Sequence, residues 1–93
     1  MSGNRAPDAS FLTIVYTMAA QAMIALGEIP NPITGETKFD PRQAKWHLDS
    51  IKILRDKTRG NLDDSEEQAL LNALGEVSMK YADRSASAEG SQK

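Results

Sequence analysis

The chain has 93 residues, of which 40% are hydrophobic and 26% charged, and this size and composition predict a single globular domain. It contains no cysteine, which excludes disulfides, thiolate nucleophiles and zinc sites built with sulfur, and which is compatible with the reducing cytoplasm that we predict as its location. The formal net charge of −2 argues against a general nucleic-acid binder, because neutralising phosphates requires a basic surface.

Both ends of the chain are small and polar in composition. Positions 1–9 are predicted to form a flexible arm, and positions 85–93, with Ser, Ala, Glu, Gly, Gln and Lys, are predicted to be a disordered tail. The domain between them, 10–84, is predicted to be an all-α, three-helix antiparallel bundle with helices at about 10–27, 41–59 and 64–82. Because so small a domain has a thin margin of stability, we expect dimerisation to complete it.

The first helix is apolar over most of its circumference. From Phe11 to Leu26 it carries no charged residue, whereas an ordinary surface helix is apolar over roughly a third of its circumference. Asp8 or Ser10 is expected to cap its start, and Gly27 to end it in the left-handed conformation. Two further helices of one chain are not expected to cover such a helix. The polar interruptions recur every four residues in one narrow stripe: Thr13, Thr17 and Gln21.

This apolar helix predicts self-association, with a homodimer favoured and an unknown protein partner as the other reading. Exposed apolar side chains disfavour a monomer, and the alanines of the helix would let a second helix approach closely. No membrane span is expected, because a span needs about 20 apolar residues and this run is shorter and interrupted. The predicted interface residues are Phe11, Leu12, Val15, Met18, Ala19, Ala22, Met23, Leu26 and Trp46.

The segment 28–40 is predicted to be a fairly stiff loop. It contains Pro30 and Pro32, and Gly35 can supply the positive φ that a turn requires. Whether positions 37–39 pair as a short strand is left open by the sequence.

The second helix is predicted to start at Asp40 and Pro41, because aspartate caps a helix and proline at its first position loses only an unpartnered N–H group. Gly60 and Asn61 are expected to form the structural turn that follows it. The helix is locally basic. We favour a solvated charged face over pairing with the acidic start of the third helix, and we expect no nucleic-acid binding.

The third helix begins with an acidic segment. Either Asp63 with Glu66 or Asp64 with Glu67 can form a capping box, in which each residue's side chain accepts from the other's backbone N–H group. Gly75 lies in the interior of the helix, where glycine is less favourable than alanine by about 1 kcal/mol. We favour the close approach of another backbone at this glycine over a helix boundary.

No residues of the chain are predicted to be catalytic, to bind a cofactor or to bind a metal, so we do not expect an enzyme. His47 is the only histidine, and Asp49, two positions away, points to another side of a helix. The acids near position 64 lie where a helix start favours negative charge. The serines have no glycine-flanked turn of the kind that presents a nucleophile, and no glycine-rich phosphate loop is found.

A set of short motifs resembles the bacterial domain-of-unknown-function family eighteen forty-four. The resemblance covers roughly Phe11 to Tyr81, and it implies a short, soluble, mostly helical bacterial protein. It brings no established activity, cofactor or catalytic residue. The motifs are Leu26-Gly27-Glu28, Asn31-Pro32 with Thr34-Gly35-Glu36, Ala44-Lys45 followed by Leu48-Asp49, and Leu54 with Lys57-Thr58-Arg59-Gly60-Asn61-Leu62.

Together these features predict a small non-enzymatic helical protein that associates with itself or with a partner. The alternative function is binding of a small apolar ligand or an acyl chain in the bundle core, where Phe11, Met18 and Met23 would line an apolar pocket.

Overall fold

The computed structural model describes residues 8–90 and contains three α-helices: α1 (Phe11–Leu26), α2 (Pro41–Lys57) and α3 (Asp64–Gly90). The described residues form no strand, so positions 37–39 do not pair within the chain. The predicted fold class, all-α with three helices packed together, is confirmed. Most of the predicted arm (1–7) and the end of the predicted tail (91–93) lie outside the described residues.

Each helix starts at a side chain that satisfies a free backbone N–H group. The Ser10 hydroxyl accepts from the Thr13 N–H at 3.0 Å. Asp40 likewise caps α2 ahead of Pro41. At α3 the capping box is formed by Asp63 with Glu66, at positions 63 and 66 rather than 64 and 67, with N···O distances of 2.8 and 3.0 Å.

The first helix ends in a Schellman motif at Gly27, which has φ +79°. The N–H group of Gly27 donates to the Ile24 carbonyl, and that of Glu28 donates to the Met23 carbonyl at 2.9 Å. The returning loop packs against this end, because the Asp40 N–H group donates to the Ala25 carbonyl at 2.7 Å. The start of α2 is thereby fixed beside the end of α1.

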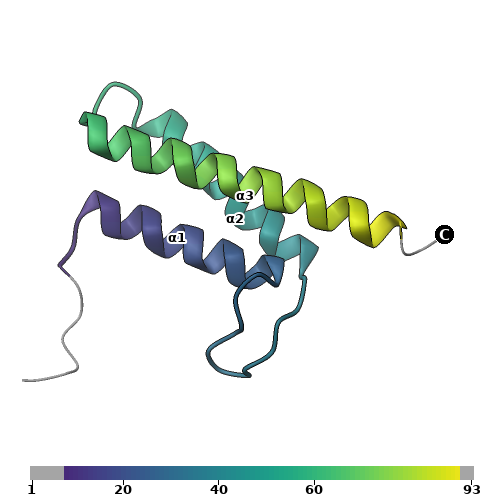
Figure 1. The fold of residues 1–93 in the computed structure, drawn as a ribbon. Helices are drawn as coiled ribbons and strands as arrows, with labels where there is room; N and C mark the ends of the chain where they lie inside the picture. Colours follow the sequence, from purple (N-terminus) through teal and green to yellow (C-terminus); the bar gives the residue numbers. More distant parts are fainter. Residues whose placement is uncertain (1–7, 91–93) are drawn as a thin grey trace, which may run out of the picture.

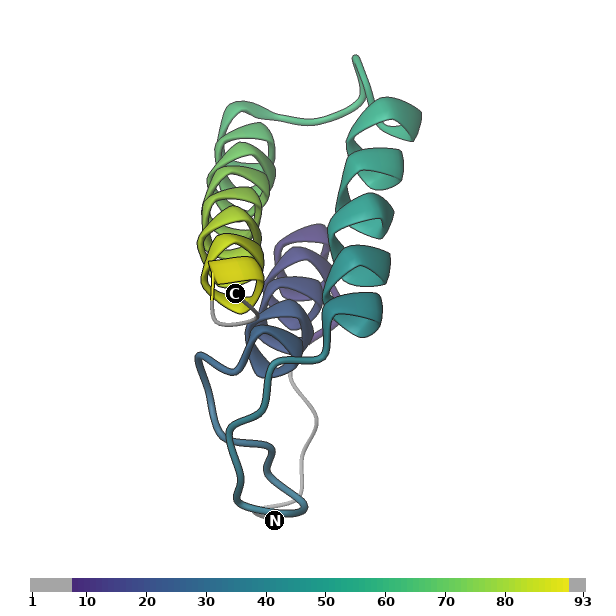
Figure 2. The same ribbon diagram turned by 90° about the vertical axis from the view of Figure 1, so that its right-hand side faces the viewer.

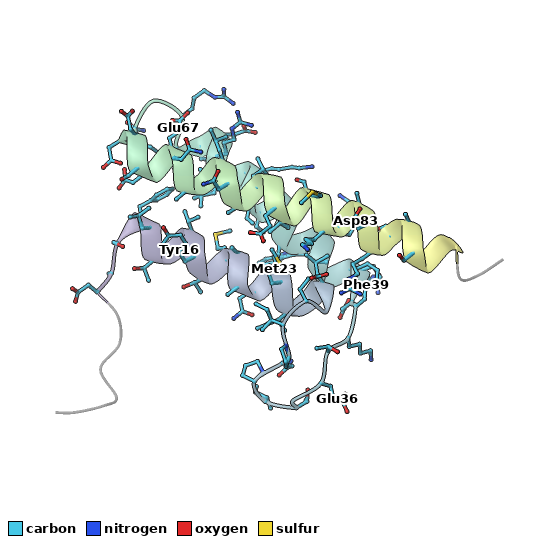
Figure 3. All side chains as sticks on the ribbon, in the orientation of Figure 1. Tyr16, Met23, Glu36, Phe39, Glu67 and Asp83 are labelled. Atoms are coloured by element: carbon cyan, nitrogen blue, oxygen red, sulfur yellow. The ribbon has the colours of Figure 1, made fainter. Side chains whose placement is uncertain are left out.

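Each helix packs against both of the others (Figures 1 and 2). In Figure 1, α1 and α3 both run from left to right, and the loop between α1 and α2 projects away from the helices. The side chains that fill the space between the helices are apolar (Figure 3). The buried core consists of Val15, Ala22, Met23, Ala25, Leu26, Ala44, Leu48, Ile51, Leu70, Ala73 and Val77.

The third helix is longer than expected, since it continues past Ala82 and through positions 85–90 of the predicted tail. Two features account for the difference. Ala86 and Ala88 favour a helix. Arg84 also holds the last turns in place, because its side chain reaches Glu28 at the end of α1.

Among the described residues, no helix is both long enough and apolar enough to cross a membrane.

Candidate functional site

The loop between α1 and α2 is folded on itself through Asn31. The side-chain oxygen of Asn31 accepts from the N–H group of Ile33 at 2.8 Å, and its backbone carbonyl accepts from that of Gly35 at 2.7 Å. The Asn31 N–H group donates in turn to the Glu36 carbonyl at 2.8 Å. These bonds make a closed turn with Gly35 at φ +75°. The exposed side chain of Ile33 lies within this turn.

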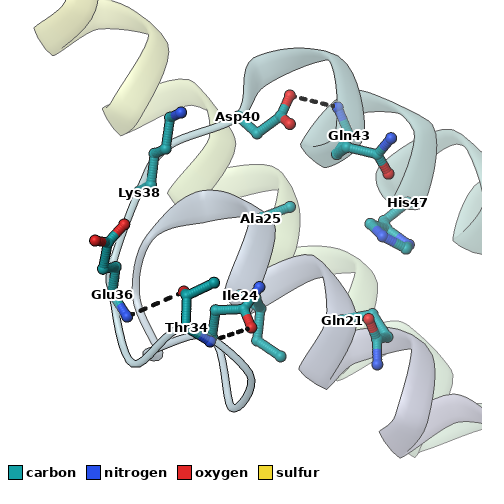
Figure 4. A pocket seen from close by; sticks show the side chains of 10 residues that line it. Gln21, Ile24, Ala25, Thr34, Glu36, Lys38, Asp40, Gln43 and His47 are labelled. Carbon is teal, nitrogen blue, oxygen red and sulfur yellow. Dashed lines mark hydrogen bonds between the residues drawn. The ribbon is translucent and has the colours of Figure 1, made fainter.

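A cavity of about 400 Å³ lies between this loop, the end of α1 and the start of α2 (Figure 4). Gln43 and His47 of α2 line one side, and Thr34 of the loop lines the other. Ile24 and Ala25 of α1 contribute apolar surface. Amide, hydroxyl and imidazole groups therefore face a space of the size that holds small ligands.

The imidazole ring of His47 lines this cavity. Partial burial lowers the pKa of His47 below its usual value, because burial disfavours the charged imidazolium. The ring meets Trp46 edge to face, with centroids 5.1 Å apart. Within residues 8–90, no group of three or more histidine or acidic side chains is placed to hold a metal ion.

A second polar cluster joins the end of α1 to α3. The Glu28 carboxylate accepts from Arg84 at 2.7 and 2.9 Å and lies 3.6 Å from the Lys80 ammonium group. The hydrogen bond from Arg84 holds the pKa of Glu28 below its ordinary value. This cluster joins the residue after the end of α1 to the C-terminal half of α3.

The structure divides the predicted interface residues into three groups. Val15, Ala22, Met23 and Leu26 are buried in the core of the single chain and offer no surface to a second copy in this arrangement. Phe11, Met18 and Ala19 are half-buried and pack against that core, and Leu12 is also half-buried. Trp46 is 63% exposed on α2.

The exposed side of α1 uses other residues, which we call the outward face of α1: Ile14, Tyr16, Thr17, Ala20 and Gln21. Ile14 is 51% exposed and Tyr16 is 60% exposed, and the smaller Thr17 and Ala20 lie between them around the helix. No charged residue occurs anywhere on the helix. The polar stripe of the sequence marks this face, because Thr17 and Gln21 are exposed and Thr13 is half-buried. The expectation that the rest of the helix is buried is wrong, since Ile14 and Tyr16 stay exposed.

The four residues predicted to form structural turns, Gly27, Gly35, Gly60 and Asn61, all lie at a helix end or in a loop of the structure. Gly27, Gly35 and Gly60 all have positive φ. The N–H group of Asn61 donates to the Thr58 carbonyl at 2.9 Å, which closes the turn after α2.

The cavity is lined by residues other than Phe11, Met18 and Met23, which were expected to surround an apolar ligand. It lies outside the space between the three helices and has a mixed polar and apolar lining.

The chain was compared with curated proteins, solved structures and models of protein families. No curated protein matches the chain, and no solved structure matches it. The family described as a domain of unknown function (DUF1844) matches residues 8–83, which include α1, α2 and most of α3. The chain therefore belongs to the DUF1844 family.

Proposed function

We propose that this protein is a non-enzymatic module that forms a homodimer through the outward face of α1. The observation that carries the proposal is the exposure of Ile14 and Tyr16 on a helix that has no charge along its length. Exposed apolar side chains are common singly, but a whole exposed helix face without a charged residue is typical of an interaction surface.

A second copy of the chain suits this face on physical grounds. Pairing two uncharged faces removes apolar surface from water and requires no charged group to lose its hydration. A two-fold arrangement uses the same patch on both subunits, so one uncharged face is enough to build the contact. The small side chains of Thr17 and Ala20 would allow the two helices to approach closely.

The family resemblance and the cysteine-free composition support a bacterial cytoplasmic setting for this proposed dimer. The proposed interface lies on the same helix as the interface predicted from the sequence, but it uses exposed residues such as Ile14 and Tyr16 in place of buried ones such as Val15 and Leu26. An unknown protein partner could occupy the same face, and the experiment below distinguishes the two cases.

Sedimentation equilibrium at tens of micromolar tests the proposal. The wild-type chain is expected to have the mass of a dimer, and Ala20→Lys is expected to shift it toward the monomer, because pairing would bury an unpartnered ammonium group. Ala20 is exposed and lysine is a good helix former, so the variant should fold.

The matched control is Ile53→Lys on α2. Ile53 is 59% exposed, as much as the apolar residues of α1, but its helical neighbours include Asp49, Asp56 and Lys57. This control should sediment as the wild type does. A folded wild-type monomer at these concentrations would contradict the proposal, and so would equal effects of the two lysine substitutions.

A further inference from the structure

The cavity beside the loop that joins α1 to α2 has rigid walls. The loop is held by the bonds of the Asn31 turn and by the Asp40 N–H group, which donates to the Ala25 carbonyl at 2.7 Å. Pro30 and Pro32 restrict its backbone further. The remaining walls are α1 and α2, and the Asp40 bond fixes the end of one beside the start of the other. A cavity that is formed before a ligand arrives costs little to order on binding.

Three uncharged polar side chains line this cavity and are not used by the rest of the chain. Gln21 comes from α1, and Gln43 and His47 come from α2, one helical turn apart (Figure 4). Among the described residues, none of these three side chains makes a hydrogen bond with another protein group. By contrast, the Thr34 hydroxyl accepts from the Glu36 N–H group at 3.3 Å and so serves the loop itself. The amides and the imidazole are therefore available to a ligand.

The chemistry of the lining selects the kind of ligand. A glutamine amide carries an acceptor beside a donor, so it pairs with a ligand edge that carries a donor beside an acceptor, as it does with adenine. Ile24 and Ala25 supply apolar surface for the rest of such a ligand. The charged residues of the lining set two carboxylates against a single ammonium group, so a phosphate gains no net attraction there; they are Glu36, Lys38 and Asp40.

We propose that this cavity binds a small uncharged molecule with an amide-type edge, the chemistry that nucleosides and carboxamides share. The Gln43 amide takes that edge through a pair of hydrogen bonds, and His47 takes a further polar atom of the ligand. The site lies within one chain and does not rest on the α1 dimer. Gln21 belongs also to the outward face of α1, so the test variants are placed on α2.

NMR titration of the ¹⁵N-labelled full chain tests the site, with adenosine in one arm and nicotinamide in the other. At least one probe should shift the backbone resonances of Gln43 and His47 along a saturable curve, and the arm with the lower Kd identifies the source of the edge. Gln43→Met keeps the length of the side chain and His47→Phe keeps an aromatic ring, but each removes hydrogen-bonding atoms. Each should raise the Kd at least about tenfold. Gln68→Met, at an exposed glutamine of α3 outside the cavity, should leave the Kd unchanged.

Both titrations are made on the wild type and on Ala20→Lys, so that a dimer covering the cavity cannot hide the site. The absence of a saturable shift in both proteins with both probes would overturn the proposal and would leave the α1 dimer, which sedimentation measures, unaffected. An unchanged Kd in Gln43→Met and His47→Phe, with the helical circular dichroism of the wild type, would also overturn it. So would adenosine 5′-monophosphate binding more than about tenfold tighter than adenosine, because phosphate recognition would then dominate.

Discussion

Replacing Gly27 by alanine should destabilise the protein more than the same replacement at Gly60. Both glycines have positive φ, +79° and +85°, so alanine at either position meets the left-handed penalty of about 1 to 2 kcal/mol. The lower entropy of the unfolded chain offsets about 0.4 to 1 kcal/mol of it. Nothing lies within 4 Å of an added Cβ at Gly60, so the expected net loss there is about 1 kcal/mol.

At Gly27 the new Cβ also meets the returning loop. It would lie 3.2 Å from the carbonyl carbon of Lys38 and 3.3 Å from the backbone nitrogen of Phe39. The loop backbone at Lys38 and Phe39 cannot move freely, because the N–H group of the next residue, Asp40, donates a hydrogen bond to the Ala25 carbonyl. We therefore expect a further loss of about 1 kcal/mol, the usual scale for overpacking, and a total near 2 kcal/mol.

Urea unfolding followed by circular dichroism measures both losses, with the wild type as reference at the same protein concentration. In thermal unfolding, each kcal/mol should lower the Tm by roughly 4 to 8 °C. Equal losses at the two positions would refute the close approach of the loop to Gly27. No loss at Gly60 would refute the left-handed turn after α2.

Three further predictions test the core, the surface cluster and the cavity. Leu26→Ala should lower the free energy of unfolding by about 3 kcal/mol, because Leu26 is fully buried and the truncation leaves a cavity; urea unfolding measures it. Glu28→Gln should lower the Tm at neutral pH, and the difference from wild type should shrink in acid. The folded chain lowers the pKa of Glu28, so the ionised carboxylate stabilises the fold at pH values above the unfolded pKa of 4.5. This stabilisation is lost as the pH falls through the lower pKa of the folded state. The NMR titration of His47 should give a pKa below 6.5; a value at or above it would show that the ring is not desolvated.

Local chemistry made the helix ends predictable. The serine and aspartate caps, the proline at the start of α2 and the glycine at the end of α1 each act through neighbouring backbone groups, so the sequence alone is sufficient to place them. The sequence left two registers open for the capping box of α3, and only the geometry at Asp63 selects one.

Long-range contacts were not predictable in the same way. The extension of α3 depends partly on Arg84 reaching Glu28 at the end of α1, a contact between residues far apart in the chain. The choice of the face that α1 turns to its own core also depends on the other helices. Its sequence offers apolar side chains on several sides, and packing buries Val15 and Leu26 while leaving Ile14 and Tyr16 exposed.

The most direct test of the account is to cross-link copies through the outward face of α1. Because the chain contains no cysteine, a thiol introduced singly at Thr17, Ala20 or Gln21 is unique and can pair only with its copy in another chain. Mild oxidation should yield a covalent dimer from at least one of these variants, much faster than from Ile53→Cys on α2. Formation of covalent dimer at the Ile53→Cys rate by all three variants would contradict the claim that α1 pairs with its copy.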